Sequence, residues 1–351
     1  MSNPAPRPLF ALRPPELAAL CVELGGKAFH AKVVRGEVLE RGVLDYAKMT
    51  GLSKSLRDAL AERAPILAGT EVARSTSRDG TTKLLIDFGA VAGRSGAVET
   101  VHIPPRELGG PKGATLCVSS QVGCPVRCPF CASGKLGLAR NLEPHEIVEQ
   151  YLRGRALGAL SRSVVMGIGE PLLNFPNVSA ALDVVHDDLG LGARKVTVST
   201  VGFPDRLREI APRKPRFQLA ISLHTPFDEQ RDELVPAMKG VPIDDVLSAA
   251  DFWFETTGRE VTYEYVLLAG VTDTPEHARR LAERLRRRRC TVNLIPFNPV
   301  SDSEFARPSS DAVDRMFAAL TERGIVATVR WSRGVEGDAA CGQLRIRANA
   351  R

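Results

Sequence analysis

The first part of the chain has the apolar spacing of short helices. Four apolar residues follow the i, i+3, i+4, i+7 spacing of one helix face: Leu17, Leu20, Cys21 and Leu24. The glycine pair after them ends this helix, and Cys21 is expected to be a small core residue. A second helix, capped by a serine, is expected over residues 53–63. Residues 1–68 are therefore predicted to form a small helical domain.

From residue 70 the pattern changes to the alternation that is typical of strands. The tripeptide RDG at residues 78–80 separates two extended stretches and indicates a hairpin turn. A third alternating stretch, VETVHIP, covers residues 98–104. Residues 69–111 are expected to be a β extension that leads into the next domain.

One carboxylate in the third stretch lies on an apolar face. Alternation with period two places Glu99 on the same side as Val101 and Ile103. Carboxylates are rarely buried without a partner, so the pattern alone favours an edge position or a salt bridge over a catalytic role.

From residue 112 onward, short β-rich runs alternate with helical patterns. The strand candidates are Leu116–Ser119, Ser163–Gly167, Val196–Thr200, Gln218–His224, Thr262–Leu268 and Thr291–Pro296. The helical patterns after them cover residues 143–158, 176–188, 203–211, 243–256, 275–289 and 309–323. Repeated βα units predict an α/β fold with a parallel sheet and helices outside it. The units are too few for a closed barrel, so residues 112–351 are predicted to form a partial (β/α)6 barrel with its site at the carboxyl ends of the strands.

The charge of the chain favours an anionic partner. The 351 residues carry a formal net charge of +6, which suits nucleic acid without requiring it. No apolar run reaches the length of about 18 residues that a membrane-spanning helix needs. The N-terminus lacks the apolar core and cleavage site of a secretory signal, so we expect a cytoplasmic protein with no membrane contact.

Four of the seven cysteines lie within LCVSSQVGCPVRCPFC, residues 116–131. Cys124, Cys128 and Cys131 have C-x3-C-x2-C spacing, and Cys117 stands apart. A structural zinc site needs four ligands, commonly as two C-x2-C pairs, and no second pair lies nearby. Three thiolates suit a four-iron–four-sulfur (4Fe–4S) cluster with one open iron. The motif resembles that of the radical S-adenosylmethionine (SAM) enzymes, in which the open iron binds SAM and one electron cleaves it to a 5′-deoxyadenosyl radical.

Small and polar residues follow the other predicted strands. In MGIGEPLLN, Gly167 and Gly169 permit close approach of the backbone to a ligand, and Glu170 can receive the SAM ammonium group. VSTVG, AISLH and IPFN end three further strands, and the carboxyl ends of parallel strands meet at one mouth. The candidate SAM contacts in these motifs are Ser199, Ser222, Leu223, His224 and Asn298. Each of them alone is equally well explained by a strand-end hydrogen bond.

Several longer motifs together are similar to the RlmN/Cfr family of RNA adenine methyltransferases. They are LCVSSQVGC, the three-cysteine motif, GEPLLN, ISLH, VNLIPFNP and DAACGQL, and the likeness extends to GVLDYAKMTGLSKSLRDAL and VETVHIP. The resemblance covers nearly the whole chain. It implies an N-terminal helical domain that binds RNA, a partial barrel, a 4Fe–4S cluster and two molecules of SAM per turnover.

The same resemblance implies roles for the remaining candidates. Cys341 matches the cysteine that one SAM methylates and whose methyl group then loses a hydrogen atom to the radical. The resulting carbon radical adds to an adenine ring carbon, which joins RNA to protein. Cys117 matches the cysteine that attacks the sulfur of Cys341, releasing the product and leaving a disulfide. Glu99 matches the carboxylate that removes the adenine proton, and apolar surroundings fit a raised pKa of its carboxyl group.

A few departures from the family pattern bear on the RNA site and not on the reaction class. GIGEP replaces the usual GMGEP, VSTVG replaces STSG, and WSRGVEGDAACGQL lacks the usual acidic pair before its cysteine. The leading prediction is methylation of carbon 2 of an adenosine in 23S rRNA, with tRNA as a further candidate substrate. The alternative is the Cfr-like reaction at carbon 8, which confers antibiotic resistance.

Rivals from other classes stay open on the residues alone. They are an RNA-binding iron–sulfur protein, a radical SAM activase that acts on a partner protein, and a zinc-binding structural protein. The family implies a flavodoxin-type electron donor, and a monomer is the default expectation. Cys290 is expected to be a packing residue.

Overall fold

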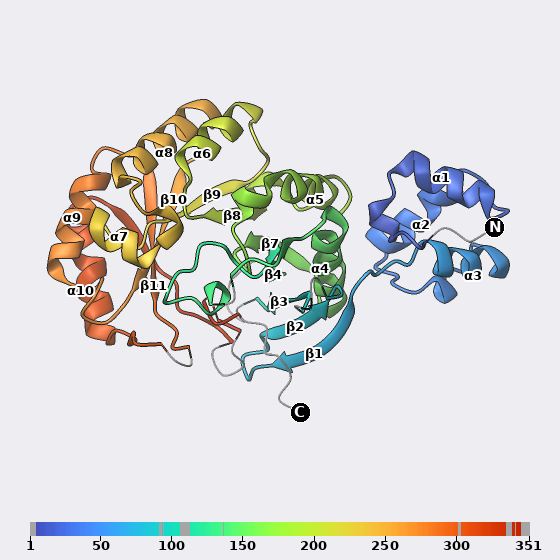
Figure 1. The fold of residues 1–351 in the computed structure, drawn as a ribbon, viewed down its shortest axis with the longest axis horizontal. Helices are drawn as coiled ribbons and strands as arrows, with labels where there is room; N and C mark the ends of the chain where they lie inside the picture. Colours follow the sequence, from blue (N-terminus) through green and yellow to red (C-terminus); the bar gives the residue numbers. More distant parts are fainter. Residues whose placement is uncertain are drawn as a thin grey trace.

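The architecture is an open barrel with a helical domain beside it (Figure 1). A computed structural model of the protein describes residues 5–90, 93, 95–105, 113–135, 137–300, 303–334, 339–340 and 342–344. Within these ranges, no helix combines the length and the apolar character needed to cross a membrane.

The N-terminal domain contains the helices α1 (Pro14–Glu23), α2 (His30–Leu39) and α3 (Lys54–Arg63). Helices α1 and α3 confirm the two helices that the sequence predicts in this domain. The Ser53 side chain caps α3 by accepting a hydrogen bond from the Leu56 N–H at 3.3 Å. The apolar spacing alone gives no clear signal for helix α2, because no side chain caps its first turn and three valines and a glycine weaken its helical pattern.

The rest of the molecule is built on one ten-stranded sheet with the strand order β1-β2-β3-β4-β7-β8-β9-β10-β11-β12. The strands are β1 (Thr70–Thr76), β2 (Thr82–Asp87), β3 (Ala97–Ile103), β4 (Ala114–Cys117), β7 (Leu160–Val165), β8 (Val196–Thr200), β9 (Gln218–Ser222), β10 (Val261–Leu267), β11 (Cys290–Pro296) and β12 (Val326–Val329). Strands β1 to β4 pair antiparallel, and β4 to β12 pair parallel. The RDG turn joins β1 to β2 as predicted, and Gly80 adopts a φ of 77°, which glycine tolerates best.

Helices follow the parallel strands and lie outside the sheet (Figure 1). They are α4 (Pro144–Leu157), α5 (Phe175–Asp187), α6 (Pro204–Ile210), α7 (Asp228–Leu234), α8 (Ile243–Thr257), α9 (Pro275–Leu285) and α10 (Ser310–Thr321). This arrangement confirms the partial (β/α)6 barrel. The sequence pattern missed the short helix α7 and the half-exposed edge strand β12, because both are too short to show a period. It also missed a small sheet of β5 (Gln121–Val122) and β6 (Arg140–Asn141).

Helix α4 connects the barrel to the N-terminal domain. The buried Glu149 carboxylate accepts hydrogen bonds from the backbone N–H groups of Ala68 at 2.5 Å and Gly69 at 3.1 Å. Six residues further on, the Arg155 guanidinium donates to the carbonyl groups of Leu39 and Glu40. These contacts use charged groups of α4 to satisfy backbone atoms of the linker and of α2.

A buried glutamine on α4 also fixes the end of strand β4. Gln150 Oε1 accepts hydrogen bonds from the Thr100 hydroxyl at 2.6 Å and the Ser119 N–H at 2.7 Å. Gln150 Nε2 donates to the Ser119 carbonyl at 2.9 Å. The Ser119 hydroxyl donates to the Glu99 carbonyl at 2.6 Å and accepts from the Ile168 N–H at 2.9 Å. Helix α4, β3, β4 and the loop after β7 are therefore joined at one residue.

We predict that Gln150→Leu lowers the free energy of unfolding by about 3 kcal/mol, because it leaves the Thr100 hydroxyl and both backbone groups of Ser119 unpaired in the core. Urea unfolding followed by circular dichroism measures this loss. The control is Gln218→Leu, since the half-buried Gln218 side chain makes no hydrogen bond within the described residues. It should change the free energy by less than about 0.5 kcal/mol. Equal losses in the two variants would contradict the assigned role of Gln150.

Candidate functional site

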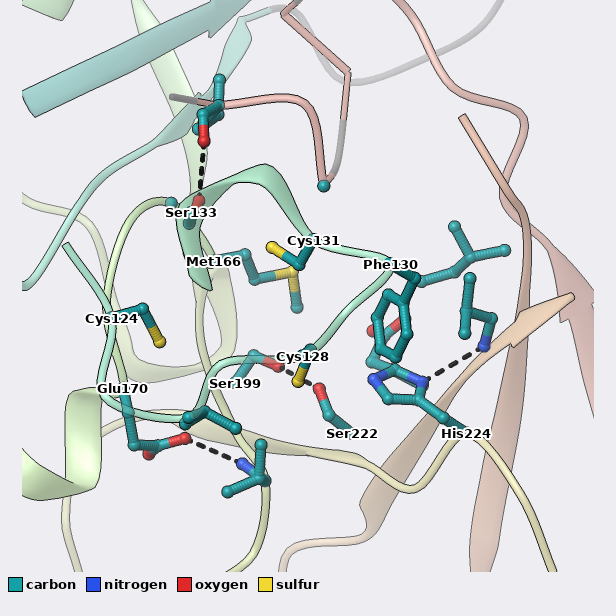
Figure 2. Close-up of a pocket in the computed structure, with 18 of the residues that line it drawn as sticks. Cys124, Cys128, Phe130, Cys131, Ser133, Met166, Glu170, Ser199, Ser222 and His224 are labelled. Carbon is teal, nitrogen blue, oxygen red and sulfur yellow. Dashed lines mark hydrogen bonds between the residues drawn. The ribbon is translucent and has the colours of Figure 1, made fainter. Parts of the chain in front are cut away.

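A pocket lies at the carboxyl ends of the barrel strands (Figure 2). The predicted residues that line it are Cys124, Cys128, Cys131, Gly169, Glu170, Ser199, Ser222, His224 and Asn298. They come from the loops or strand ends after β4, β7, β8, β9 and β11. The structure therefore brings together residues from across half the chain, at the end of the barrel where such folds place their sites.

The three-cysteine motif forms a loop that is closed at its base by the small β5–β6 sheet. Within it the Cys131 N–H donates to the Cys128 carbonyl at 3.1 Å, which turns the chain back on itself. Figure 2 shows the sulfur atoms of Cys124, Cys128 and Cys131 turned toward a common space in the pocket. The spacing of the motif thus produces three convergent thiols on one loop.

The donor set fits a 4Fe–4S cluster. Burial raises the pKa of the Cys124 thiol to about 12, and burial together with the neighbouring thiols raises the pKa of Cys128 well above its usual range. Thiolates are the ligand form, so binding of a cluster must displace these protons. Among the described residues, no group of three His, Cys, Asp or Glu side chains is arranged to hold a single metal ion. In a 4Fe–4S cluster each thiolate binds a different iron, so its ligands surround a larger volume.

Glu170 lines the same pocket, after a glycine turn. Gly169 has a φ of 115°, and a Cβ atom there would lie 2.7 Å from Ser120 Oγ, so only glycine fits. The Glu170 carboxylate accepts hydrogen bonds from the N–H groups of Leu172 at 3.0 Å and Val201 at 2.9 Å. Burial outweighs these bonds and raises the pKa of Glu170 to about 7. An ammonium group in the pocket would favour the charged carboxylate.

The ends of β8 and β9 contribute two hydroxyl groups and an imidazole. Ser199 Oγ and Ser222 Oγ are 3.4 Å apart and both line the pocket. His224 Nδ1 accepts a hydrogen bond from the Val266 N–H at 3.2 Å, and the ring contacts Phe130 edge-on with centroids 5.0 Å apart. Burial and the nearby Arg231 lower the pKa of His224 to about 3, so the imidazole is neutral. With Nδ1 as the acceptor, the proton is on Nε2, which can donate to a ligand.

Leu223 is the predicted contact whose side chain lies away from the pocket. It is fully buried in the core, and its backbone N–H donates to the Glu264 carbonyl at 3.0 Å. Asn298 lines the pocket at the end of β11, with its Nδ2 donating to Ser332 Oγ at 2.7 Å and its Oδ1 accepting from Arg307 at 3.2 Å.

An unpredicted arginine lies beneath these strand ends. The Arg231 side chain is 1% exposed and donates to the carbonyl groups of Val201 at 2.6 Å and Leu223 at 3.4 Å. Its Nη1 is buried and has no hydrogen-bond partner among the described residues. Burial lowers the pKa of Arg231 to about 10, and Cys128 is the acidic group that most favours its charged form. A cation is therefore fixed close to the cysteine loop.

A second pocket adjoins the first and contains Cys117. Met166 and Leu344 line both pockets, so the two are neighbours. Cys117 pairs with Val101 across the β3–β4 register, and strand alternation places Glu99 on the same face as Val101. The carboxyl group of Glu99, with 4% of the side chain exposed, forms an ion pair with Lys83 at 2.8 Å. The predicted apolar face thus includes a cation, which favours ionised Glu99.

The C-terminal segment is attached to the cysteine loop. The Ala132 N–H donates to the Gly342 carbonyl at 2.8 Å, and the Ser133 hydroxyl donates to the Leu344 carbonyl at 2.8 Å. Gly342 lines the pocket of the three cysteines, and Ala340 lines the pocket of Cys117. Cys341 itself lies outside the described residues.

The other cysteines are remote from these pockets. Cys21 is buried in the N-terminal domain, and Cys290 begins β11, where burial raises the pKa of its thiol to about 11. All six described cysteines are free thiols, so the disulfide expected from the family resemblance is absent from this part of the chain. That disulfide belongs to one step of a reaction and would involve Cys341.

Sequence reasoning missed three charged residues of the site. Lys83 and Arg231 act across tertiary contacts that no local pattern reveals. Glu264 on β10 lines the first pocket and accepts a hydrogen bond from Asn293 at 2.9 Å. The available signal for Glu264 was its position inside the apolar strand VTYEYVLL, because a charged residue is seldom buried in a core unless it has a partner.

The fold and the three-cysteine pocket define a radical SAM protein. Residues 118–285 match the Radical SAM superfamily, and residues 8–66 match the Ribosomal RNA large subunit methyltransferase N-terminal domain. The crystal structure of a radical SAM methyltransferase from Sphaerobacter thermophilus superposes with a TM-score of 0.88 at 39% identity, covering 97% of this chain and 99% of that one. The cofactors are accordingly a 4Fe–4S cluster and SAM.

Relatives place the chain more narrowly. A protein of Nostoc punctiforme, named "Probable dual-specificity RNA methyltransferase RlmN", is 42% identical over 349 residues, which cover 97% of this chain and 94% of the relative. A protein of the same name from Synechocystis is 40% identical over 346 residues, covering 97% and 95%. The chain belongs to the RlmN family of radical SAM RNA methyltransferases.

The raised pKa of Glu170 predicts a pH-dependent stability of the apoprotein. The folded state holds this proton more tightly than the unfolded state does, so its contribution is complete below about pH 4.5 and is lost as the pH rises through about 7. Relative to Glu170→Gln, the wild type should lose about 3 kcal/mol of unfolding free energy between these limits. Urea unfolding at several pH values measures the difference.

The matched control is Glu255→Gln, which removes an exposed carboxylate on α8. Its unfolding free energy should follow the wild-type pH profile. A Glu170→Gln protein that also follows that profile would show that the carboxyl group of Glu170 titrates normally.

Proposed function

We propose that this protein methylates carbon 2 of an adenosine in 23S rRNA, with tRNA as a second substrate, through a methylated Cys341. The observation that carries the proposal is the adjacency of two pockets, one with three convergent thiols and one with Cys117, with Met166 and Leu344 lining both. The names of the relatives support the RNA substrates.

The first pocket is suited to hold the two cofactors. When bound, the cluster and SAM supply a 5′-deoxyadenosyl radical and a transferable methyl group. Cys124, Cys128 and Cys131 would hold the cluster. The Glu170 carboxylate would bind the SAM ammonium group, and the His224 Nε2–H would donate to another polar group of SAM. The other proposed contacts are Gly169, Ser199, Ser222, Leu223 and Asn298, of which Leu223 can contribute only backbone atoms.

Cys117 in the second pocket, and Glu99 on the neighbouring strand β3, are suited to complete the reaction. Glu99 would take the proton from the adenine ring carbon, with the Lys83 ammonium group beside its carboxylate at 2.8 Å. The Cys117 thiolate would then attack the sulfur of Cys341 and form a disulfide, while the electron pair of the broken sulfur–carbon bond stays on the methylene carbon, which takes up a proton and becomes the methyl group on the RNA. External reduction of that disulfide restores both thiols.

The domains, the electron donor, the oligomeric state and the location of the protein are proposed as well. Residues 1–68 would be an RNA-binding accessory domain, residues 69–111 a β extension and residues 112–351 the catalytic barrel. A flavodoxin-type protein would supply the electron, and the enzyme would act as a monomer in the cytoplasm, where its RNA substrates are.

We predict that a host lacking its own enzyme accumulates 2-methyladenosine in 23S rRNA when it expresses this protein. Cys128→Ala should abolish the product, because the cluster loses a ligand. The matched control Cys290→Ala removes a cysteine far from both pockets and should retain the product. Nucleoside mass spectrometry with chromatographic separation of the methyladenosine isomers makes the measurement, on rRNA and tRNA fractions separately.

The isomer decides between the two branches of the family. Accumulation of 8-methyladenosine would refute the carbon-2 assignment in favour of the Cfr-like reaction. Absence of both isomers in the wild type, with the cluster fully loaded, would favour an iron–sulfur protein without methyl transfer.

We predict that Cys117→Ala leaves RNA covalently bound to the protein, since no thiol remains to attack the sulfur of Cys341. Denaturing gel electrophoresis before and after ribonuclease treatment detects the adduct. Cys21→Ala, which removes a buried cysteine of the N-terminal domain, is the control and should give no adduct. Normal turnover by Cys117→Ala would refute the role given to this thiol.

A further inference from the structure

The second pocket lies in the open seam of the barrel. On one side are β3 and β4, which contribute Ile103 and Cys117, and on the other is the segment after β12. Arg333 of that segment crosses the seam, donating to Asp79 Oδ2 at 3.1 Å and to the Pro104 carbonyl at 2.6 Å. Within the described residues Arg333 therefore bridges the seam, and the pocket that contains Cys117 lies beside this bridge.

A tryptophan lies at this opening. Trp331 lines the pocket, and 43% of its surface is exposed, whereas the other tryptophan of the chain, Trp253, is fully buried. The Arg307 guanidinium carbon is 6.0 Å from the centroid of the Trp331 ring. A large aromatic ring left in water beside a pocket suits a ligand that offers a flat apolar face.

The charges around the ring define the class of that ligand. Arg330 and Arg333 line the same pocket, and Arg307 lies against the ring. Arg333 has an acidic partner in Asp79, whereas no carboxylate within the described residues forms an ion pair with Arg307. Aromatic faces flanked by arginines are typical of sites for single-stranded nucleic acid, where bases stack and phosphates meet the guanidinium groups.

We infer that Trp331 is a stacking platform for an unpaired nucleobase of the RNA substrate, which enters the barrel through this seam. Arg307 and Arg330 would then meet the neighbouring phosphates. The inference rests on the proposed function, because it takes RNA as the substrate, and it adds the residue that holds the strand next to the reacting adenosine. Enzymes that modify a base take it out of the stack, so a surface that receives an unstacked neighbour lowers the cost of that step.

Fluorescence can follow this contact directly, because the two tryptophans differ in exposure. An aqueous quencher such as acrylamide reaches Trp331 and not Trp253. We expect a saturable loss of the Trp331 signal when the full-length protein is titrated with a single-stranded adenosine-containing RNA oligonucleotide. Bound RNA should also reduce the quenching of Trp331 fluorescence by acrylamide.

Affinity measurements by fluorescence anisotropy with labelled RNA test the energetic role. Trp331→Ala should weaken binding about tenfold, within the range that one stacked base contributes. Trp331→Phe keeps an aromatic face and should retain most of the affinity. The matched control is Phe252→Ala, which removes an exposed aromatic ring on α8, away from both pockets, and should bind as the wild type does.

The outcomes separate this inference from the proposed function. Binding of RNA with equal affinity by the wild type and Trp331→Ala overturns the inference alone. An unchanged Trp331 signal at saturating RNA does the same without requiring any variant to fold. Failure of the wild type to bind rRNA or tRNA fragments overturns the proposed function and the inference together.

Discussion

The placement of the site depends on the pairing of buried polar groups at the end of β4. Ser119 uses its N–H, its carbonyl and its hydroxyl to contact Gln150, Glu99 and Ile168. An unpaired polar group in the core raises the free energy of the folded state. These bonds therefore hold the loop that begins at Ser119 in one favourable position. The strand of Glu99, helix α4, the cysteine loop and the glycine turn before Glu170 are thereby placed relative to one another before a cofactor binds.

The electrostatics of the first pocket follow from its burial. The Cys124 and Cys128 thiols are protonated, His224 is neutral, Glu170 has a pKa of about 7, and the buried Arg231 guanidinium is a fixed positive charge close to Cys128. Such a pocket favours an anionic thiolate-bound cluster and a ligand with an ammonium group. Binding of the cluster and of the ammonium-bearing ligand therefore displaces protons and leaves ionic groups in the pocket. The protein groups that pair with these charges are already in place.

The sequence was most informative where function depends on local spacing. The C-x3-C-x2-C motif and the strand-end motifs could be placed correctly because parallel strands deliver their carboxyl ends to one side. Long-range partners could not be found in this way. Lys83 meets Glu99 through strand pairing, and Arg231 reaches carbonyl groups on two strands from a helix too short to predict. The exposure of Trp331 depends on how the segment after β12 meets the β1–β3 side.

An incomplete barrel must protect two sheet edges while leaving its interior accessible. Strand β1 forms one edge, and its polar sequence, its irregular register between Glu71 and Ala73, and the Glu71–Arg74 ion pair oppose pairing with another chain. Strand β12 forms the other edge and is only four residues long. A closed barrel of this type fills its interior with side chains, which would exclude a polymer. Within the described residues, the gap between the segment after β12 and the β3–β4 side contains the pocket of Cys117, through which a nucleotide of a large RNA would reach side chains that are otherwise buried.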